Sequence, residues 1–201
     1  MNNYPDDWNI KTLDEVCSRI WIGLVTTMTK FYVKKGVKLI RNSDIRENNI
    51  DVKNLIQLDQ EFSKKNDKYL VKTDDVVTVH TGDVGTSCVI SEDISPAQGF
   101  ATLNSRLNKK IMFPEFYSYY LNSDFFKNQT SKVITGDGRN NLNLKDFIKL
   151  KIIVTTLAEQ KKITEIISEI DQLLENINKQ ISKLQYLQKA VMCELLNSGI
   201  D

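Results

Sequence analysis

The chain has 201 residues, of which 41% are hydrophobic and 26% charged, and it contains only 8 glycines and 3 prolines. These fractions are typical of soluble globular proteins, and they exclude a disordered chain, a collagen-like repeat and a disulfide scaffold. The formal net charge is only +1, which by itself does not indicate a nucleic-acid partner.

The first 155 residues alternate short apolar stretches with polar loops, a pattern typical of a mixed α and β domain. In chain order, we expect strands at residues 36–40, 75–80, 87–90 and 150–154, a turn at 81–85, a helix at 116–121 and a polar glycine loop at 134–142. Three aromatic residues, Phe116, Tyr119 and Tyr120, recur at helical spacing in the expected helix. This spacing predicts that they belong to the core.

The last 45 residues carry an apolar repeat with steps of three and four, which predicts one long amphipathic helix. Thr156 and Glu159 form a capping-box pattern at its start, and residues 197–199 mark its end. About 40 residues at 1.5 Å each make a rod of roughly 60 Å, longer than a small domain needs for its own core. The repeat therefore favours a partner-binding rod over a core helix. The expected seam is Ile163, Ile166, Ile170, Leu173, Ile177, Ile181, Leu184, Leu187 and Val191.

The cysteines and the hydropathy pattern indicate the compartment. Cys17, Cys88 and Cys193 are far apart and form no CxxC pair, which predicts free thiols in a reducing cytoplasm and no structural zinc site. No stretch approaches the roughly 18 apolar residues of a membrane span, and the N-terminus has no signal-peptide pattern. We expect a cytoplasmic protein without a membrane partner.

A search for catalytic chemistry finds no convincing motif. His80 is the single histidine and cannot form a metal site alone, so a structural role for it is the more common reading. The sequence has no P-loop, no strand-linked GxGxxG and no nucleophile elbow. We expect a binding protein with no catalytic residue, no metal and no cofactor of its own.

The charge is distributed unevenly along the chain. Residues 157–201 hold five lysines against seven acidic residues, whereas residues 30–46 hold six basic residues against Asp44 alone. Such a basic segment is a hint of phosphate contacts, although a solvated basic loop is an equally common explanation.

Several fragments, in order along the whole chain, resemble the DNA specificity subunit of type I restriction-modification systems. Tyr4-Pro-Asp-Asp-Trp8 and Lys11-Thr-Leu-Asp-Glu-Val-Cys17 are similar to the opening of its target recognition domain. The run from Leu157-Ala-Glu-Gln160 through Ile163 and Ile166 to Asp171 is similar to the start of its conserved helix. The segments between them that resemble the family are Gly36–Ile45, Leu70–Val77, Gly82–Gly85 and Phe116–Ser123.

The chain also departs from the family pattern. Thr155-Thr156 stands where prolines often precede the helix, and Asp74 stands where glycine is common. Full subunits contain two recognition domains and two helical regions, whereas this chain has one of each and resembles a half-length form. Two copies with antiparallel rods would rebuild the full arrangement. A complete half-subunit and a fragment of a longer protein both fit the sequence, and the Met start favours the former.

The resemblance implies an α+β fold: a globular mixed α/β target recognition domain at residues 1–155, followed by a long C-terminal coiled-coil helix at residues 156–201. It implies a non-catalytic subunit that reads a half-site in double-stranded DNA, dimerises, and positions modification subunits. In that family, modification subunits use S-adenosylmethionine to methylate adenine, and a restriction subunit uses ATP and Mg. The residues that we expect at the DNA are Lys30, Lys34, Lys35, Arg41, Asn42, Arg46, His80, Thr81, Arg139, Asn140 and Asn141.

A competing hypothesis is a non-catalytic coiled-coil adaptor whose globular head binds protein. It explains the rod and the modest net charge equally well. The two hypotheses differ in salt dependence, because affinity for duplex DNA falls steeply with salt and an adaptor has no such affinity.

Overall fold

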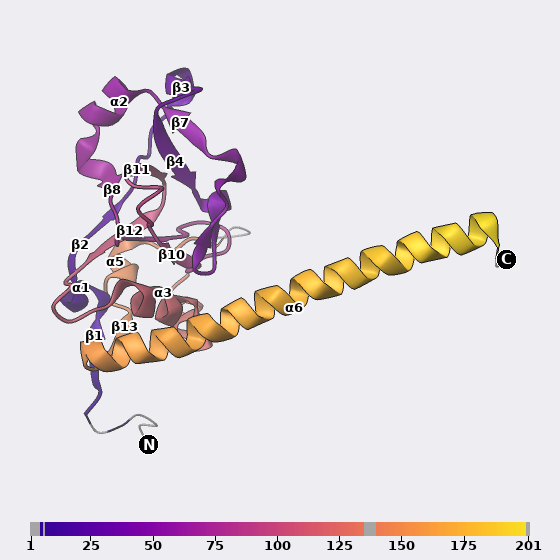
Figure 1. Ribbon diagram of the computed structural model, residues 1–201. Coiled ribbons are helices and arrows are strands. Elements are labelled where there is room, and N and C mark those ends of the chain that lie inside the picture. The colour runs from indigo at the N-terminus through magenta and orange to yellow at the C-terminus, as the bar shows by residue number, and fades with distance from the viewer. Residues whose placement is uncertain (1–4, 6, 135–139, 200–201) are drawn as a thin grey trace. The chain divides into compact units, whose positions relative to one another are not determined.

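Figure 1 shows the computed structural model, which describes residue 5 and residues 7–134 and 140–199. The chain divides into two compact units, Met1–Lys161 and Lys162–Asp201. We call the first the globular unit and the helical residues 162–198 of the second the rod. The globular unit combines sheets with short helices, and helix α6 (Leu157–Ser198) is 42 residues long. The predicted α+β fold with a long C-terminal helix is confirmed.

A four-stranded antiparallel sheet, in the order β10-β9-β12-β2, forms one half of the globular unit. Its strands are β2 (Cys17–Ile22), β9 (Val76–Thr78), β10 (Ser87–Val89) and β12 (Leu103–Leu107). Cys88 lies opposite Val77 in the register of β10 and β9. The predicted strands 75–80 and 87–90 are therefore confirmed, each shorter than expected. Residues 79 and 80 belong to the segment that connects the two strands.

A five-stranded mixed sheet, in the order β3-β7-β4-β11-β8, forms the other half. Its strands are β3 (Tyr32–Val33), β4 (Val37–Arg41), β7 (Ile56–Leu58), β8 (Leu70–Val71) and β11 (Ala97–Phe100). Strands β4 and β11 are parallel, and the other pairs are antiparallel. Strand β4 confirms the predicted strand 36–40 with a shift of one residue.

Two-stranded ribbons and short helices complete the globular unit. The ribbons are β1 (Asn9–Thr12) with β13 (Lys151–Val154), and β5 (Ile45–Arg46) with β6 (Asn49–Ile50). The α-helices are α1 (Leu13–Val16), α2 (Gln60–Lys65), α3 (Pro114–Asn122), α4 (Asp124–Thr130) and α5 (Leu144–Phe147). The 3-10 helices are η1 (Thr29–Phe31), η2 (Asn42–Asp44), η3 (Val52–Asn54) and η4 (Asp67–Tyr69). Strand β13 and helix α3 confirm the predicted strand 150–154 and helix 116–121.

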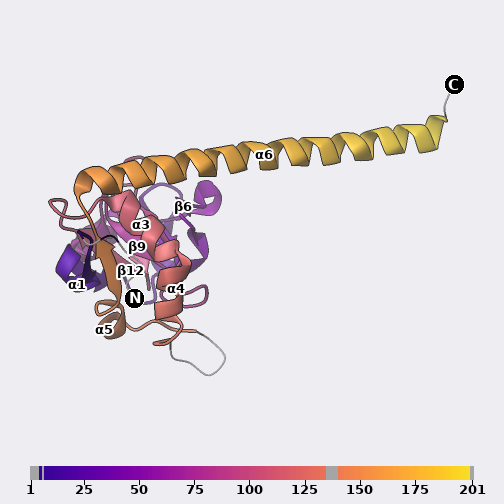
Figure 2. The same ribbon diagram turned by 90° about the horizontal axis from the view of Figure 1, so that it is seen from below.

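The core lies between the two large sheets. Trp21 and Val77 from the four-stranded sheet pack with Ile40 and Ala97 from the five-stranded sheet, and all four are buried. Helix α3 packs against strand β10, where the Ser118 hydroxyl donates to the Ser87 carbonyl at 3.3 Å. Figure 2 shows α3 leading into helix α4. Alternating residues of each strand thus serve two packed layers.

The burial of the aromatic residues in α3 differs from the prediction. Phe116 is buried as expected, but Tyr119 and Tyr120 are only half-buried. Tyr117 and Leu121 are fully buried instead, because the buried stripe of a helix follows steps of four as well as three. Tyr117 also contacts the Ser105 hydroxyl at 3.1 Å.

The first turn of α6 is anchored to the globular unit through Gln160, which is fully buried. Its amide oxygen accepts from the Phe113 N–H at 2.8 Å, and its amide nitrogen donates to the carbonyls of Ile111 at 2.9 Å and Thr155 at 2.8 Å. A buried amide with both ends bonded fixes the helix start, since leaving either end unpaired costs about 1–3 kcal/mol.

The predicted capping box is only half correct. The Thr156 hydroxyl accepts from the Glu159 N–H at 3.3 Å. The Glu159 carboxylate, however, accepts from the Thr155 hydroxyl and from the Trp8 indole, whose nitrogen is 3.2 Å from both oxygens. In a capping box, the Glu159 carboxylate would accept from the backbone N–H of Thr156. Here it accepts from Trp8 instead.

The rod ends as predicted at residues 197–199. Helix α6 ends at Ser198, and Gly199 follows with φ of +75°, where its N–H donates to the Leu195 carbonyl at 3.0 Å. A left-handed glycine is a common helix end because it has no Cβ to clash. None of the helices in the described ranges is long and apolar enough to span a membrane.

The three cysteines are free thiols. Burial raises the pKa of Cys17 to about 12 and also raises the pKa of Cys88. Both are therefore protonated at neutral pH and unreactive. Within the described residues, no group of three or more His, Cys, Asp or Glu side chains is placed to hold a metal ion.

Candidate nucleic-acid interface

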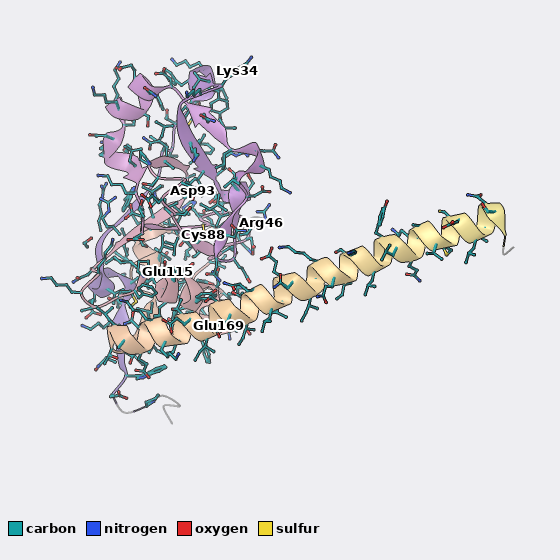
Figure 3. The ribbon with its side chains drawn as sticks, in the orientation of Figure 1. Lys34, Arg46, Cys88, Asp93, Glu115 and Glu169 are labelled. Atoms are coloured by element: carbon teal, nitrogen blue, oxygen red, sulfur yellow. The ribbon has the colours of Figure 1, made fainter. Side chains whose placement is uncertain are left out.

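The basic segment 30–46 does not form one continuous site. Strand β4 runs through it, with Lys30, Lys34 and Lys35 before its start and Arg41, Asn42 and Arg46 at or after its end. Five residues of strand span roughly 16 Å. Figure 3 shows Lys34 and Arg46 well apart on the globular unit. Strand β4 thus separates the predicted residues of this segment into two groups, and their contact with DNA stays a prediction.

The first group, which we call the lysine turn, consists of Lys30, Lys34 and Lys35. All three are exposed, and the Lys30 ammonium lies 5.1 Å from the centre of the Phe31 ring, which stacks on Phe62. The Lys30 side chain thus lies on a stacked aromatic pair, and Lys34 and Lys35 extend the exposed positive charge beside it. Exposed positive side chains suit phosphate contacts, which position a protein on DNA without reading bases.

Gly36 closes the lysine turn. A Cβ at this position would meet the Leu58 carbonyl oxygen at 2.1 Å, and the Gly36 N–H donates to the Gln57 side chain at 2.7 Å. The close approach of the two backbones requires a residue without a side chain. The sequence pattern alone placed this glycine at the start of a strand and did not reveal its role in packing.

At the other end of β4, Arg41 is already paired. Its guanidinium donates to both carboxylate oxygens of buried Asp44, with nitrogen-oxygen distances of 2.9 and 2.7 Å. The hydrogen bonds to Asp44 raise the pKa of Arg41. Arg46 is exposed and donates to the carbonyls of Ser43 at 2.7 Å and Ile45 at 3.0 Å. Arg41 thus stabilises helix η2, and its predicted contact with DNA stays a prediction.

The structure brings five of the predicted residues together in a second group, the asparagine–histidine cluster. Its members come from three segments that are far apart in the chain: Asn42, then His80 and Thr81, then Asn140 and Asn141. The Asn42 amide oxygen accepts from the His80 N–H at 3.0 Å, and the Gly82 N–H donates to the Asn140 carbonyl at 3.2 Å. The cluster therefore links the end of β4, the turn after β9 and the loop before α5.

Side chains also bond directly within the asparagine–histidine cluster. The Thr81 hydroxyl donates to the Asn141 amide oxygen at 2.9 Å and lies 2.9 Å from His80 Nδ1. Burial lowers the pKa of His80, so its ring is neutral at pH 7. A half-buried row of neutral donors and acceptors is the chemistry that reads base edges.

The turn at residues 81–85 depends on two glycines. Gly82 and Gly85 have φ values of +104° and +95°, a region that side chains with a Cβ rarely adopt. The Thr86 hydroxyl donates to the Asp83 carboxylate at 2.9 Å and closes the turn. These bonds hold the Thr81 side of the turn in place beside Asn141.

Arg139, the remaining predicted DNA contact, lies outside the described residues. The nearest described member of the predicted loop is Asn140, which is exposed.

The sequence analysis missed the asparagine network that supports the β5–β6 ribbon. Asn48 has a φ of 55°, and its amide oxygen accepts from Ser118 and Asn122, each at 2.8 Å. Its N–H donates to the Ser87 carbonyl at 2.9 Å. These bonds fix the turn that follows Arg46. The Asn48-Asn49 pair is a turn signal that the sequence does contain.

The predicted seam of the rod is exposed along most of its length. Ile163 is half-buried. The other eight expose between 47% and 65% of their surface: Ile166, Ile170, Leu173, Ile177, Ile181, Leu184, Leu187 and Val191. A continuous exposed apolar stripe of this length marks an interaction surface.

The chain is similar to known proteins along most of its length. Residues 5–186 match the family model described as the type I restriction modification DNA specificity domain. The chain is 24% identical over 192 residues to the type I restriction enzyme EcoBI specificity subunit of Escherichia coli, covering 90% of this chain and 40% of that subunit. The chain thus spans less than half the length of that relative.

Two solved structures share the fold. A chain from a study of complex assembly and conformational transition of the type I R-M system has a TM-score of 0.72 at 17% identity, covering 98% of this chain and 48% of that one. The HsdS subunit from Thermoanaerobacter tengcongensis has a TM-score of 0.67 at 18% identity, covering 100% of this chain and 53% of that one.

Proposed function

The chain belongs to the family of type I restriction modification DNA specificity domains, and from this premise we propose that its globular unit reads one half-site in duplex DNA. The chain has no catalytic role of its own in this proposal. It selects the sequence at which other subunits act.

The asparagine–histidine cluster carries this proposal. Three distant segments converge on it, and bonds of 2.9 to 3.0 Å hold its hydroxyl, its neutral imidazole and two of its three side-chain amides. The third segment is also held by its backbone, because the Asn140 carbonyl accepts from the Gly82 N–H at 3.2 Å. Preorganised side chains lose little entropy on binding and discriminate donors from acceptors in the major groove. The lysine turn is about 16 Å away along β4 and supplies phosphate contacts that set the register.

The rod provides the second part of the proposal. Its exposed seam pairs with the seam of a second copy, antiparallel as in the two halves of a full subunit, so that two globular units lie at opposite ends. A homodimer of this kind reads two inverted copies of one half-site, because twofold symmetry places identical heads on opposite strands. The rod length sets the spacer between them.

Partner subunits supply the chemistry. Modification subunits that bind S-adenosylmethionine dock on the paired rods and methylate adenine in the selected site. A restriction subunit that uses ATP and Mg joins them for cleavage. These partners follow from the family and act in the cytoplasm.

Methylation mapping tests the proposal. DNA from cells that express the chain with a modification subunit is sequenced for methylated adenines, and the expected site is an inverted repeat with a fixed spacer. Deleting two heptads from the rod should shorten the spacer and leave the half-site bases unchanged. A site with two different halves would contradict the homodimer, and a purified chain without salt-dependent DNA affinity would favour a protein-binding adaptor.

A further inference from the structure

Basic side chains that were not among the predicted DNA contacts surround the buried indole of Trp21. The Arg19 guanidinium carbon lies 4.4 Å from the centre of the Trp21 ring, and the Arg106 guanidinium carbon lies 5.3 Å from it. Trp21 itself is 5% exposed, and its N–H donates to the Tyr69 carbonyl at 3.3 Å. The indole is thus a fixed platform for two cations. We call Arg19, Trp21, Lys68 and Arg106 the guanidinium stack.

Among the residues that the structure describes, only Arg106 of the two arginines in the stack has an acidic partner. Arg106 donates to both carboxylate oxygens of buried Asp75, at 2.8 and 2.6 Å. Arg19 lies directly opposite Arg106 in the register of β2 and β12, and its guanidinium donates to the Lys68 carbonyl at 2.8 Å. Like charges in opposite positions on neighbouring strands destabilise a sheet. Asp75 offsets the charge of Arg106, so Arg19 keeps the net positive charge of this pair and can take an anion.

The surrounding segment adds further positive charge. Residues 64–72 contain Lys64, Lys65, Lys68 and Lys72 against Asp67 alone, and all five are exposed. The Lys68 ammonium lies 5.0 Å from the centre of the Tyr69 ring. Strand β2 brings Arg19 to this segment, so the basic surface exists only in the folded chain.

Protection of a sheet edge explains part of this arrangement. Strand β2 is an edge strand, and a charged side chain there discourages pairing with another chain. A mobile lysine would serve that purpose. Arg19 is instead held by an indole and a carbonyl, which lowers the entropy cost of binding a ligand and leaves a planar fork suited to phosphate oxygens.

We infer that the guanidinium stack binds a phosphodiester group of the DNA backbone, with Arg19 and Lys68 as the contacting residues. This inference rests on the proposed function. The strand registers place Arg19 on β2 level with Arg106 on β12, and Arg106 level with Asp75 beside β9. Asp75 precedes His80 by five residues, and β2 is two strands away from β9. That places Arg19 roughly 16 Å along the strands and about 10 Å across them from the asparagine–histidine cluster. The separation corresponds to about five or six base-pair steps of 3.4 Å.

Salt titration of duplex DNA binding tests the inference with the full chain and a random-sequence duplex of about 30 base pairs. Arg19→Gln keeps a donor for the Lys68 carbonyl and removes the charge. Loss of one phosphate contact lowers the salt slope by about one. The ratio of variant to wild-type Kd should therefore fall about fourfold between 50 and 200 mM salt. Lys68→Ala should behave in the same way, and the sequence preference of both variants should stay unchanged.

The control is Lys149→Ala, which removes an exposed lysine between α5 and β13. Trp21 fluorescence and the thermal midpoint check that each variant is folded. The inference would be overturned if the ratio of variant to wild-type Kd did not change with salt, or if Lys149→Ala changed it equally. In either case a salt-dependent wild-type affinity would still support DNA binding. A wild-type chain with no salt-dependent affinity would overturn both. If Arg19→Gln lost binding to poly-glutamate and kept its DNA salt slope, the stack would be a site for an acidic protein instead.

Discussion

The globular unit and the rod use the same residue types in opposite ways. In the globular unit, Leu39 and Ile40 are fully buried and form part of the core. In the rod, Ile170 and Ile177 each expose 50% of their surface and Leu184 exposes 65%. A domain that buries its own apolar surface folds alone, whereas a long helix gains most of its stability from packing its apolar face against another element. The comparison teaches that the globular unit buries its own apolar surface, whereas the rod leaves an apolar stripe exposed.

Polar groups show the same contrast. In the globular unit, buried Asp75 and Gln160 are bonded to Arg106 and Phe113, which are far away in the sequence. In the rod, the described ion pairs are local, such as Lys179 with Glu175 one turn away at 2.7 Å. Exposed pairs of this kind contribute only about 0.3–0.5 kcal/mol. Partner packing, and not surface charge, is therefore expected to hold the rod.

The largest expected effect comes from the rod. Replacing Ile170, Ile177 and Leu184 together with glutamine removes three apolar side chains from each copy, and each contributes about 1.5–3 kcal/mol when buried. We expect the dimer to dissociate while the globular unit stays folded. Sedimentation at micromolar concentration measures the change.

The matched control replaces Gln172, Lys179 and Lys183, which are exposed on the same helix, with alanine. This variant should sediment like the wild type. A wild-type chain that is already a monomer at micromolar concentration would contradict the homodimer.

The next effect concerns the globular unit alone. A Cβ at Gly23 would lie 2.3 Å from the Gly99 carbonyl oxygen, and because the obstacle is backbone, the two strands must move apart. Gly23→Ala is expected to lower the free energy of unfolding of the globular unit by about 1–3 kcal/mol. Chemical denaturation followed by Trp21 fluorescence checks this. Sedimentation of the dimer should be unchanged at concentrations where the unit is folded, and a variant as stable as wild type would show that the strands have room to separate.

A smaller effect is expected at the lysine turn. Changing Lys34 and Lys35 to alanine removes two phosphate contacts and should lower the salt slope of DNA binding by about 1.8. Affinity for all sequences should weaken alike, because phosphate contacts carry no base information. Fluorescence anisotropy over a range of salt concentrations measures both quantities. If affinity and slope stay at wild-type values, the turn is a solvated loop.

The smallest effect is the pH dependence of His80. Burial lowers its pKa in the folded chain below the value of about 6.5 in the unfolded chain. The unfolded chain then binds the proton more readily, so stability from this residue is present above pH 6.5 and is lost as the pH falls below it. The thermal midpoint of the wild type should fall more between pH 7 and 5.5 than that of His80→Gln. Equal falls in both proteins would show that His80 does not contribute.

Local signals in the sequence predicted some of the regular elements, whereas strands β2, β11 and β12 and helices α2 and α4 were not predicted. The apolar repeat after residue 156 determines the long helix, since a period near 3.5 places every apolar residue on one stripe. The apolar stretches at residues 36–40 and 150–154 likewise predict β4 and β13 to within one residue. The glycines at 82, 85 and 199 mark turns that require positive φ. The ordered fragments also identified the family, because their order is a property of the sequence itself.

Tertiary structure alone decided which polar residues meet. Nothing local in the sequence relates Asn42 to His80 or Thr81 to Asn141, and the fold places each pair within hydrogen-bond distance. Conversely, Lys34 and Arg46 are close in sequence, but β4 separates them. The sequence analysis did not consider Arg19, because its role depends on Trp21 and on a register across β2 and β12. Helical and strand periodicity act over a few residues, whereas a binding site depends on strand order and register, which only the packed core determines.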